Sequence, residues 1–129
     1  MIFDTDVIIF AGKNKAFAEQ AIMKAKERRI TVATYMEFVP YCRDRLELNK
    51  FTKMLTHLRF SILPITESSS NLAKDLVLNY ALSHSMRMGD ALNAAIAIDT
   101  GETLCTCNAK DFKYIPNLLL QPLKVASRN

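Results

Sequence analysis

Apolar runs long enough to cross a membrane are missing from the sequence, and so is a basic segment followed by an apolar one at its start. A membrane-spanning helix needs about 20 consecutive apolar residues, and a secretory signal needs both of those segments. We therefore expect a soluble, cytoplasmic protein with no membrane partner. Only 3 glycines and 4 prolines interrupt the 129 residues, which predicts long elements joined by short loops.

Cysteine is also scarce. The three residues Cys42, Cys105 and Cys107 are odd in number, and the last two alternate with Thr106 in a strand-like segment, where adjacent side chains point to opposite faces. This pattern favours buried free thiols over a disulfide or a thiolate metal site. The sequence also lacks a glycine-rich phosphate-binding loop and an HExxH motif, and it gives no support for a Ser-His-Asp catalytic triad. Those absences argue against phosphate-loop enzymes, HExxH zinc proteases and serine hydrolases.

Hydrophobic residues make up half of the sequence and charged residues 23%, with no repeat or low-complexity run, as is typical of a globular chain. A chain of this length buries roughly two thirds of its unfolded surface, which is enough for a core. We therefore predict a single domain over residues 1–129. The net charge of +4 permits a polyanionic partner without demonstrating one.

Short apolar or β-branched segments alternate with helical patterns along the chain. The predicted strands are 1–4, 30–33, 60–65, 103–106 and 118–120. The predicted helices are 7–12, 14–29, 34–43, 46–58, 72–83 and 88–98. We expect Thr5 or Asp6 to cap the first of them and Thr34 to cap the third. The serine run before residue 72 is expected to cap the fifth. Such alternation implies parallel pairing with right-handed crossovers. The expected fold class is α/β, a three-layer α/β/α sandwich with a four- to five-stranded, mainly parallel sheet.

Acidic and amide side chains follow the predicted strands. Asp4 ends the first strand, Glu37 lies in the first turn of the helix after the second, and Asn108 and Asp111 follow the fourth, while Asp90 begins the most apolar helix. Parallel sheets bind ligands beyond the carboxyl ends of their strands. Carboxylates gathered there repel one another unless a counter-ion is present, and hard divalent cations supply one.

Four stretches of the sequence resemble PIN-domain ribonucleases, and more closely the VapC toxins of prokaryotic toxin–antitoxin pairs. They are MIFDTDVII, ITVATYMEF, MRMGDALNAAIAIDTG and LCTCNAKDFKYIPNLLLQP, which run in family order and span nearly the whole chain. The resemblance implies a PIN-like fold and an endoribonuclease that hydrolyses RNA phosphodiesters. It also implies that Asp4, Glu37 and Asp90 bind one or two Mg²⁺ or Mn²⁺ ions and act in catalysis.

Other positions match the family pattern less completely. Asn108 stands where many relatives carry aspartate, and Asp111 offers a carboxylate three residues later, so either residue can complete the site. Asp6 is either an additional metal ligand or a helix cap. Thr106 matches a hydroxyl residue that the family has near the end of the fourth strand, and Thr31 matches one at the start of the second-strand motif.

Basic residues near the same edge are candidates for binding RNA. We expect Arg87 and Lys110, with Thr106, to contact substrate, and Lys113 is a further candidate for a phosphate contact. His57 and His84 fall on predicted helices without partners at ligand spacing, so we interpret both as surface histidines.

The resemblance also implies a homodimer and a VapB-type antitoxin whose tail inserts near the acids. An apolar stripe on the helix over 46–58 is either the contact for that antitoxin or part of the core; it comprises Phe51, Met54, Leu55 and Leu58.

Two other functions are compatible with an α/β fold that has acids at a sheet edge. One is a catalytically inactive PIN-like module that binds RNA or protein, which the incomplete fourth acidic position would suit. The other is a phospho-receiver domain, which needs an aspartate at the end of the third strand. The segment ITESSS lacks that residue.

Overall fold

The computed structural model describes residues 1–126, so positions 127–129 of the predicted domain lie outside the described residues. Five parallel strands form one sheet in the order β3-β2-β1-β4-β5. The strands are β1 (Ile2–Phe3), β2 (Arg28–Thr31), β3 (Phe60–Leu63), β4 (Leu104–Thr106) and β5 (Leu120–Pro122). The prediction of a four- to five-stranded, mainly parallel sheet is confirmed.

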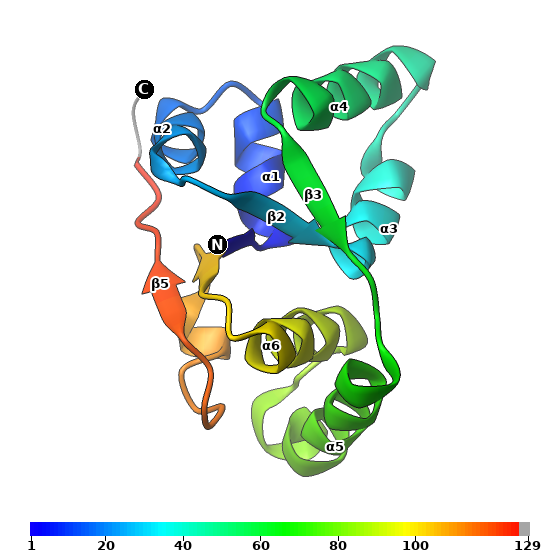
Figure 1. Cartoon of the computed structure of the whole chain (residues 1–129), viewed down its shortest axis with the longest axis vertical. Coiled ribbons are helices and arrows are strands. Elements are labelled where there is room, and N and C mark those ends of the chain that lie inside the picture. Colours follow the sequence, from blue (N-terminus) through cyan, green and yellow to red (C-terminus); the bar gives the residue numbers. More distant parts are fainter. Residues whose placement is uncertain (127–129) are drawn as a thin grey trace.

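Helices cover both faces of this sheet, so the α/β/α sandwich is also confirmed (Figure 1). The helices are α1 (Thr5–Gly12), α2 (Ala16–Lys24), α3 (Val32–Tyr41), α4 (Arg45–His57), α5 (Glu67–His84), α6 (Met88–Thr100) and the short 3-10 helix η1 (Ala109–Asp111). One core packs α5 and α6 against the sheet, and a second packs α1 to α4 against the opposite face.

Successive side chains along a strand point to opposite faces of the sheet and so enter different cores. Ile2 and Leu104 belong to the core under α5 and α6, whereas the next residues, Phe3 and Cys105, belong to the core under α1 to α4. All four side chains are buried, with exposed fractions of 1% or less. All three cysteines are free, with Cys105 buried and the other two half-buried.

The second strand and the helix after it begin earlier than predicted. Strand β2 ends at Thr31, whose hydroxyl accepts a hydrogen bond from the Thr34 backbone N–H at 3.1 Å and so caps α3. The predicted cap at Thr34 is therefore wrong, and the β-branched run Ile30–Ala33 is divided between strand and helix. Glu37 consequently lies beyond the first turn of α3. Pro40 is the penultimate residue of that helix, which ends at Tyr41.

Of the other helix boundaries, the end of α2 and the start of α5 differ most from the prediction. Helix α2 ends at Lys24 because the chain turns there, and the Arg28 guanidinium donates hydrogen bonds to the carbonyls of Met23, Ala25 and Leu58 at 3.0–3.3 Å. Helix α5 begins at Glu67, since Thr66 and Ser69 form a reciprocal capping box. The serine run lies inside the first turn instead of preceding it.

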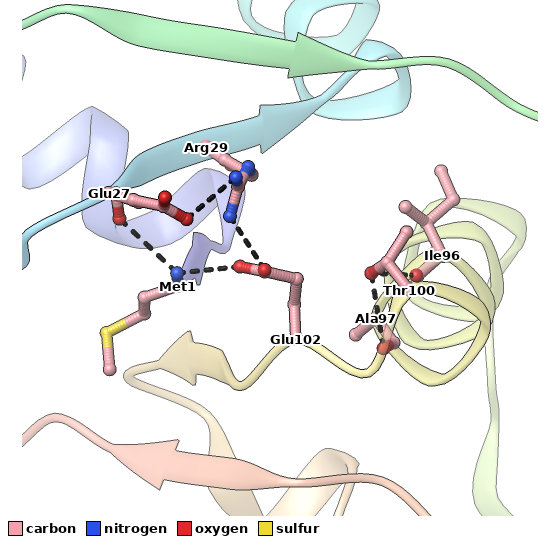
Figure 2. A network of polar contacts seen from close by, with 7 residues as sticks. All are labelled: Met1, Glu27, Arg29, Ile96, Ala97, Thr100 and Glu102. Carbon is pink, nitrogen blue, oxygen red and sulfur yellow. Dashed lines mark hydrogen bonds and ion pairs between the residues drawn. The ribbon is translucent and has the colours of Figure 1, made fainter.

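An ion-pair network joins the amino ends of the central strands (Figure 2). Glu102, just before β4, accepts from the Met1 amino group at 2.7 Å and pairs with Arg29 of β2 at 2.6 Å. Arg29 also pairs with Glu27 at 2.7 Å. Arg29 and its partner Glu102 are mostly buried, so the network fixes three neighbouring chain segments at the end of the sheet away from Asp4.

Within residues 1–126, no helix combines the length and apolar character that crossing a membrane requires.

Candidate active site

Asp4 occupies the junction between β1 and α1, where it is 7% exposed. It is the N-cap of α1, with Oδ1 accepting from the Thr5 backbone N–H at 2.9 Å, so the predicted cap at Thr5 or Asp6 is wrong. Oδ1 also accepts from Asn93 Nδ2, and Oδ2 accepts from Thr106 Oγ1, each at 2.8 Å. Burial raises the pKa of Asp4, and these hydrogen bonds oppose the rise.

Asp6 lies beside Asp4 and faces the segment after β4. Its Oδ2 accepts from the Asn108 side-chain amide at 2.9 Å and from the Cys107 backbone N–H at 3.1 Å. Its Oδ1 is buried and has no hydrogen-bond partner among residues 1–126. Burial, followed by the charge of Asp4, raises the pKa of Asp6 to about 6. Asp6 therefore joins the two strand ends and keeps one oxygen available.

Glu37 reaches from α3 toward the first turn of α6. Its Oε1 accepts from Thr5 Oγ1 at 2.9 Å. A Cβ atom at Gly89 would lie 2.8 Å from Glu37 Oε2, so this carboxylate occupies space that the glycine leaves open. Glu37 is thus adjacent to the helical turn that carries Asp90, although it comes from a different layer of structure.

Asp90 and Asp111 complete the acidic group. Burial raises the pKa of Asp90, and the charges of Asp4, Asp111 and Glu37 raise it further, whereas a backbone hydrogen bond at Arg87 opposes the rise. Asp111, at the end of η1, is exposed. The carboxylates predicted from the sequence therefore lie within electrostatic range of one another at the carboxyl end of the sheet.

Asn93 is a site residue that the sequence analysis missed. It is 1% exposed. The amide nitrogen donates hydrogen bonds to Asp4 Oδ1 and, at 3.2 Å, to Thr34 Oγ1. The amide oxygen accepts a hydrogen bond from the Thr31 hydroxyl. The signal was present, because Asn93 is the single amide in the apolar run from Ala91 to Ile98. A buried amide in such a run needs polar partners, and here they are the site itself.

The predicted substrate contacts lie in different environments. Arg87 and Lys110 are exposed, and neither forms an ion pair with another residue in the described range. Thr106 is fully buried, and its hydroxyl donates to Asp4. This placement argues against the predicted contact between Thr106 and substrate, and for a role in orienting the Asp4 carboxylate.

The donor set fits a hard divalent cation. Every candidate ligand offers oxygen, which Mg²⁺ and Mn²⁺ prefer. A carboxylate has about four acceptor positions, of which Asp4 uses three, and Asp6 Oδ1 is unpaired. Across residues 1–126, no three His, Cys, Asp or Glu side chains converge closely enough to hold a metal ion as they stand. Side-chain movement is therefore needed to bring three acids onto one ion.

Comparison with solved structures establishes the fold. The chain is 23% identical to a chain of a toxin–antitoxin complex from Klebsiella pneumoniae, covering 96% of this chain and 98% of that one, with a TM-score of 0.75. It is 23% identical to a chain of VapBC2 from Rickettsia felis, solved with a promoter DNA fragment, over 95% and 98% of the two chains at a TM-score of 0.76. For VapBC-1 of nontypeable Haemophilus influenzae the identity is 22%, the coverage 95% and 98%, and the TM-score 0.74.

Sequence comparison gives the family. No curated protein sequence matches the chain. The family model described as the PIN domain matches residues 1–118, which include every acid of the candidate site. PIN domains are generally nucleases, and these nucleases generally use divalent metals. The oxygen donors of the candidate site are compatible with metal-dependent nuclease chemistry. Because the family model matches most of its length, this chain belongs to the PIN domain family.

Proposed function

We propose that this protein is a Mg²⁺- or Mn²⁺-dependent endoribonuclease that hydrolyses RNA phosphodiesters, and that it is the toxin of a VapBC-type toxin–antitoxin pair. The observation that carries the proposal is the position of four carboxylates, from Asp4, Glu37, Asp90 and Asp111, around the carboxyl end of the sheet. Membership of a family of nucleases supports the assignment of these acids to phosphodiester hydrolysis.

In this proposal Asp4, Glu37 and Asp90 hold one or two metal ions, and either Asp111 or Asn108 completes the site. When bound, such an ion lowers the pKa of water and stabilises negative charge on a phosphodiester. Asp6 is a less central candidate, because its Oδ2 already accepts hydrogen bonds from the chain after β4 while its Oδ1 is unpaired.

Neighbouring side chains orient these acids. Asn93 and Thr106 each hold one oxygen of the buried Asp4 carboxylate, which fixes its plane. Thr5 donates to Glu37, and the same hydroxyl lies 3.0 Å from Thr34 Oγ1. The exposed cations of Arg87 and Lys110, near Asp90 and Asp111 in sequence, are suited to the phosphates flanking the bond that is cut.

The antitoxin partner is assigned to a pocket of about 930 Å³ between α1, α2, α3 and α4. The predicted apolar stripe is divided there, because Leu55, 6% exposed, packs in the core while Met54 and Leu58 line the pocket. Leu46, which is 78% exposed, extends the apolar lining to the rim. An amphipathic helix bound here would cover these side chains. The predicted homodimer is part of the proposal, and the mass in solution tests it.

The first test is a thermal melt of EDTA-treated protein with and without millimolar Mn²⁺, together with cleavage of single-stranded RNA under both conditions. A ligand that binds only the folded state raises its stability, by about 2.7 kcal/mol at a hundredfold excess over Kd. We expect Mn²⁺ to raise the melting temperature of the wild type and to support cleavage. Asp90→Asn should lose both effects and remain folded, since it removes a charge that its neighbours repel.

Asp75→Asn is the matched control, because Asp75 is an exposed acid on α5 whose ion pair within residues 1–126 is with Lys74. It should melt, bind Mn²⁺ and cleave RNA like the wild type. Cleavage by Asp90→Asn in the presence of EDTA would contradict the mechanism. Absence of a Mn²⁺ effect and of cleavage in the wild type would instead favour the catalytically inactive module that binds RNA or protein.

A further inference from the structure

Three aromatic rings pack together at the end of α5, next to the candidate active site. His84 stacks on Tyr114, which comes shortly after η1, with ring centroids 3.8 Å apart and an interplanar angle of 19°. Tyr80, one helical turn before His84, contacts both rings edge-on, at centroid distances of 5.7 Å to His84 and 4.9 Å to Tyr114. Two segments distant in the sequence thus form one aromatic surface.

The orientation of the histidine is fixed although its ring is exposed. Tyr80 and Tyr114 are half-buried and pack against the core under α5 and α6, so they form a firm base. The Ser83 hydroxyl lies 2.7 Å from His84 Nδ1. A ring held by stacking on one side and by a hydrogen bond in its plane loses little further freedom when a second flat group packs on it.

This aromatic surface borders the acids. Tyr114 is three residues beyond Asp111, and burial, followed by the charges of Asp90 and Asp111, raises the pKa of its phenol, which places it within electrostatic range of both. His84 precedes Asp90 by six residues, across the left-handed turn at Ser85, where φ is 56°.

Three exposed cations lie within four residues of His84 or Tyr114 in the sequence. Arg87, Lys110 and Lys113 are exposed, and none of them forms an ion pair with another residue of the described chain. Aromatic rings beside free cations are the combination that binds single-stranded nucleic acid, because bases stack on the rings and phosphates lie against the positive charges.

We propose that the stacked pair of His84 and Tyr114 binds a nucleobase of single-stranded RNA, next to the phosphodiester that is hydrolysed at the acidic site. The inference rests on the proposed function for the position of that phosphodiester. It adds a base-binding position that favours binding of single-stranded RNA over duplex RNA, because the bases of a duplex are already stacked on one another. His84 is then a residue that positions substrate, and it takes no part in bond cleavage.

The test measures the binding of a short single-stranded RNA that carries one 2-aminopurine, whose fluorescence is quenched when the base stacks. Binding is measured in EDTA and again in Ca²⁺. We expect quenching with the wild type, and about 10-fold weaker binding with loss of quenching for His84→Ala. His84→Trp, which restores a ring, should recover both, and Tyr114→Phe should retain them.

His57→Ala is the control, since His57 is an exposed histidine at the end of α4 and should not affect binding. A thermal melt of each variant shows that it is folded. Wild-type affinity and quenching in folded His84→Ala would overturn the base-binding site, and so would failure of the wild type to bind this RNA in either condition. Binding that depends on His84 without Mn²⁺-dependent cleavage would support the base-binding site while refuting the endoribonuclease.

Discussion

The side-chain amide of Asn93 donates a hydrogen bond to Asp4 Oδ1 at 2.8 Å, which joins α6 to the end of β1 across 89 positions of the chain. The same amide bonds to the buried hydroxyls of Thr31 and Thr34. One side chain therefore bonds to three buried polar groups, which come from the end of β1, from β2 and from α3.

Replacing Asn93 with leucine should damage both stability and function. The substitution keeps a similar volume but leaves Asp4 and the two threonine hydroxyls without this partner, and a buried polar group without its hydrogen bond costs about 1–3 kcal/mol. We expect urea unfolding of Asn93→Leu to show a loss of about 2–3 kcal/mol, and RNA cleavage by the folded protein to fall by at least about 10-fold.

Asn79→Leu provides the comparison, because Asn79 is an exposed amide on α5. It should unfold at nearly the same urea concentration as the wild type and cleave RNA at the same rate. If Asn93→Leu matched this control in both measurements, the amide network would not be what holds Asp4.

Asp6 should make the metal-free protein less stable at neutral pH than at acid pH. Its folded pKa of about 6 lies above the ordinary value of 3.8, so between these values the folded state binds more protons than the unfolded chain. The free energy of unfolding then falls as the pH rises through this window, and above it the whole penalty is present.

Asp6→Asn removes that penalty. In EDTA at about pH 7.5 we expect the variant to gain about 1–2 kcal/mol in the free energy of unfolding, allowing for solvent screening of a half-buried group, and to gain little near pH 4. Urea unfolding at both pH values measures the difference. An equal gain at both would mean that the charge of Asp6 is not its cause.

The layers of this fold are well predicted from the sequence because they depend on patterns that many residues share. Apolar strands such as that ending in Phe3, alternating with helices, are compatible with few architectures other than a parallel sheet between two helical layers. The acids are predicted at the carboxyl edge for the same reason. Topology brings together the residues just beyond the end of each strand, whatever the exact boundary.

Boundaries and supporting contacts are predicted less well, since they depend on single hydrogen bonds between distant positions. Local propensity favours a strand at Val32, but the Thr31 hydroxyl caps a helix there. The sequence indicates that Asp4 needs neutralisation, yet its partners Asn93 and Thr106 come from α6 and β4, which no local pattern connects to it. From the sequence, Asp6 could be a helix cap. The structure shows a different role, because its carboxylate accepts a hydrogen bond from the Asn108 side chain beyond β4.

A charge at the rim of the apolar pocket should separate antitoxin binding from RNA cleavage. Leu46 is exposed on α4 and lines the pocket, so Leu46→Glu leaves the core unchanged and places a carboxylate where an apolar helix face would pack. We expect binding of a VapB-type antitoxin, measured by calorimetry, to weaken by about 100-fold, with Mn²⁺-dependent cleavage unaffected.

Leu82→Glu is the matched control, because Leu82 is a fully exposed leucine on α5 and does not line this pocket. It should bind the antitoxin like the wild type. If Leu46→Glu retained wild-type affinity while Leu82→Glu lost it, the antitoxin contact would lie on α5 and the assignment to the pocket would be wrong.

Gly89→Ala should lower activity without lowering stability. Gly89 lies in the first turn of α6, and alanine favours a helix by up to about 1 kcal/mol over glycine, so the melting temperature should stay the same or rise. The added Cβ would lie 2.8 Å from Glu37 Oε2, so the carboxylate must shift to relieve the contact. Because catalysis is sensitive to displacements of about 1 Å, we expect cleavage to fall by at least about 10-fold.

Gly12→Ala is the comparison for this variant, since Gly12 ends α1 and its added Cβ would make only an ordinary contact, at 3.6 Å from Phe38. It should cleave RNA at the wild-type rate. To find the cause of the activity loss, Gly89→Ala is combined with Glu37→Gln, and cleavage by the double variant is compared with that by Glu37→Gln alone. If Gly89→Ala acts by displacing the Glu37 carboxylate, its effect should shrink once that carboxylate no longer carries charge. An undiminished loss would show that the added methyl group disturbs Asp90 itself and does not act through the Glu37 carboxylate.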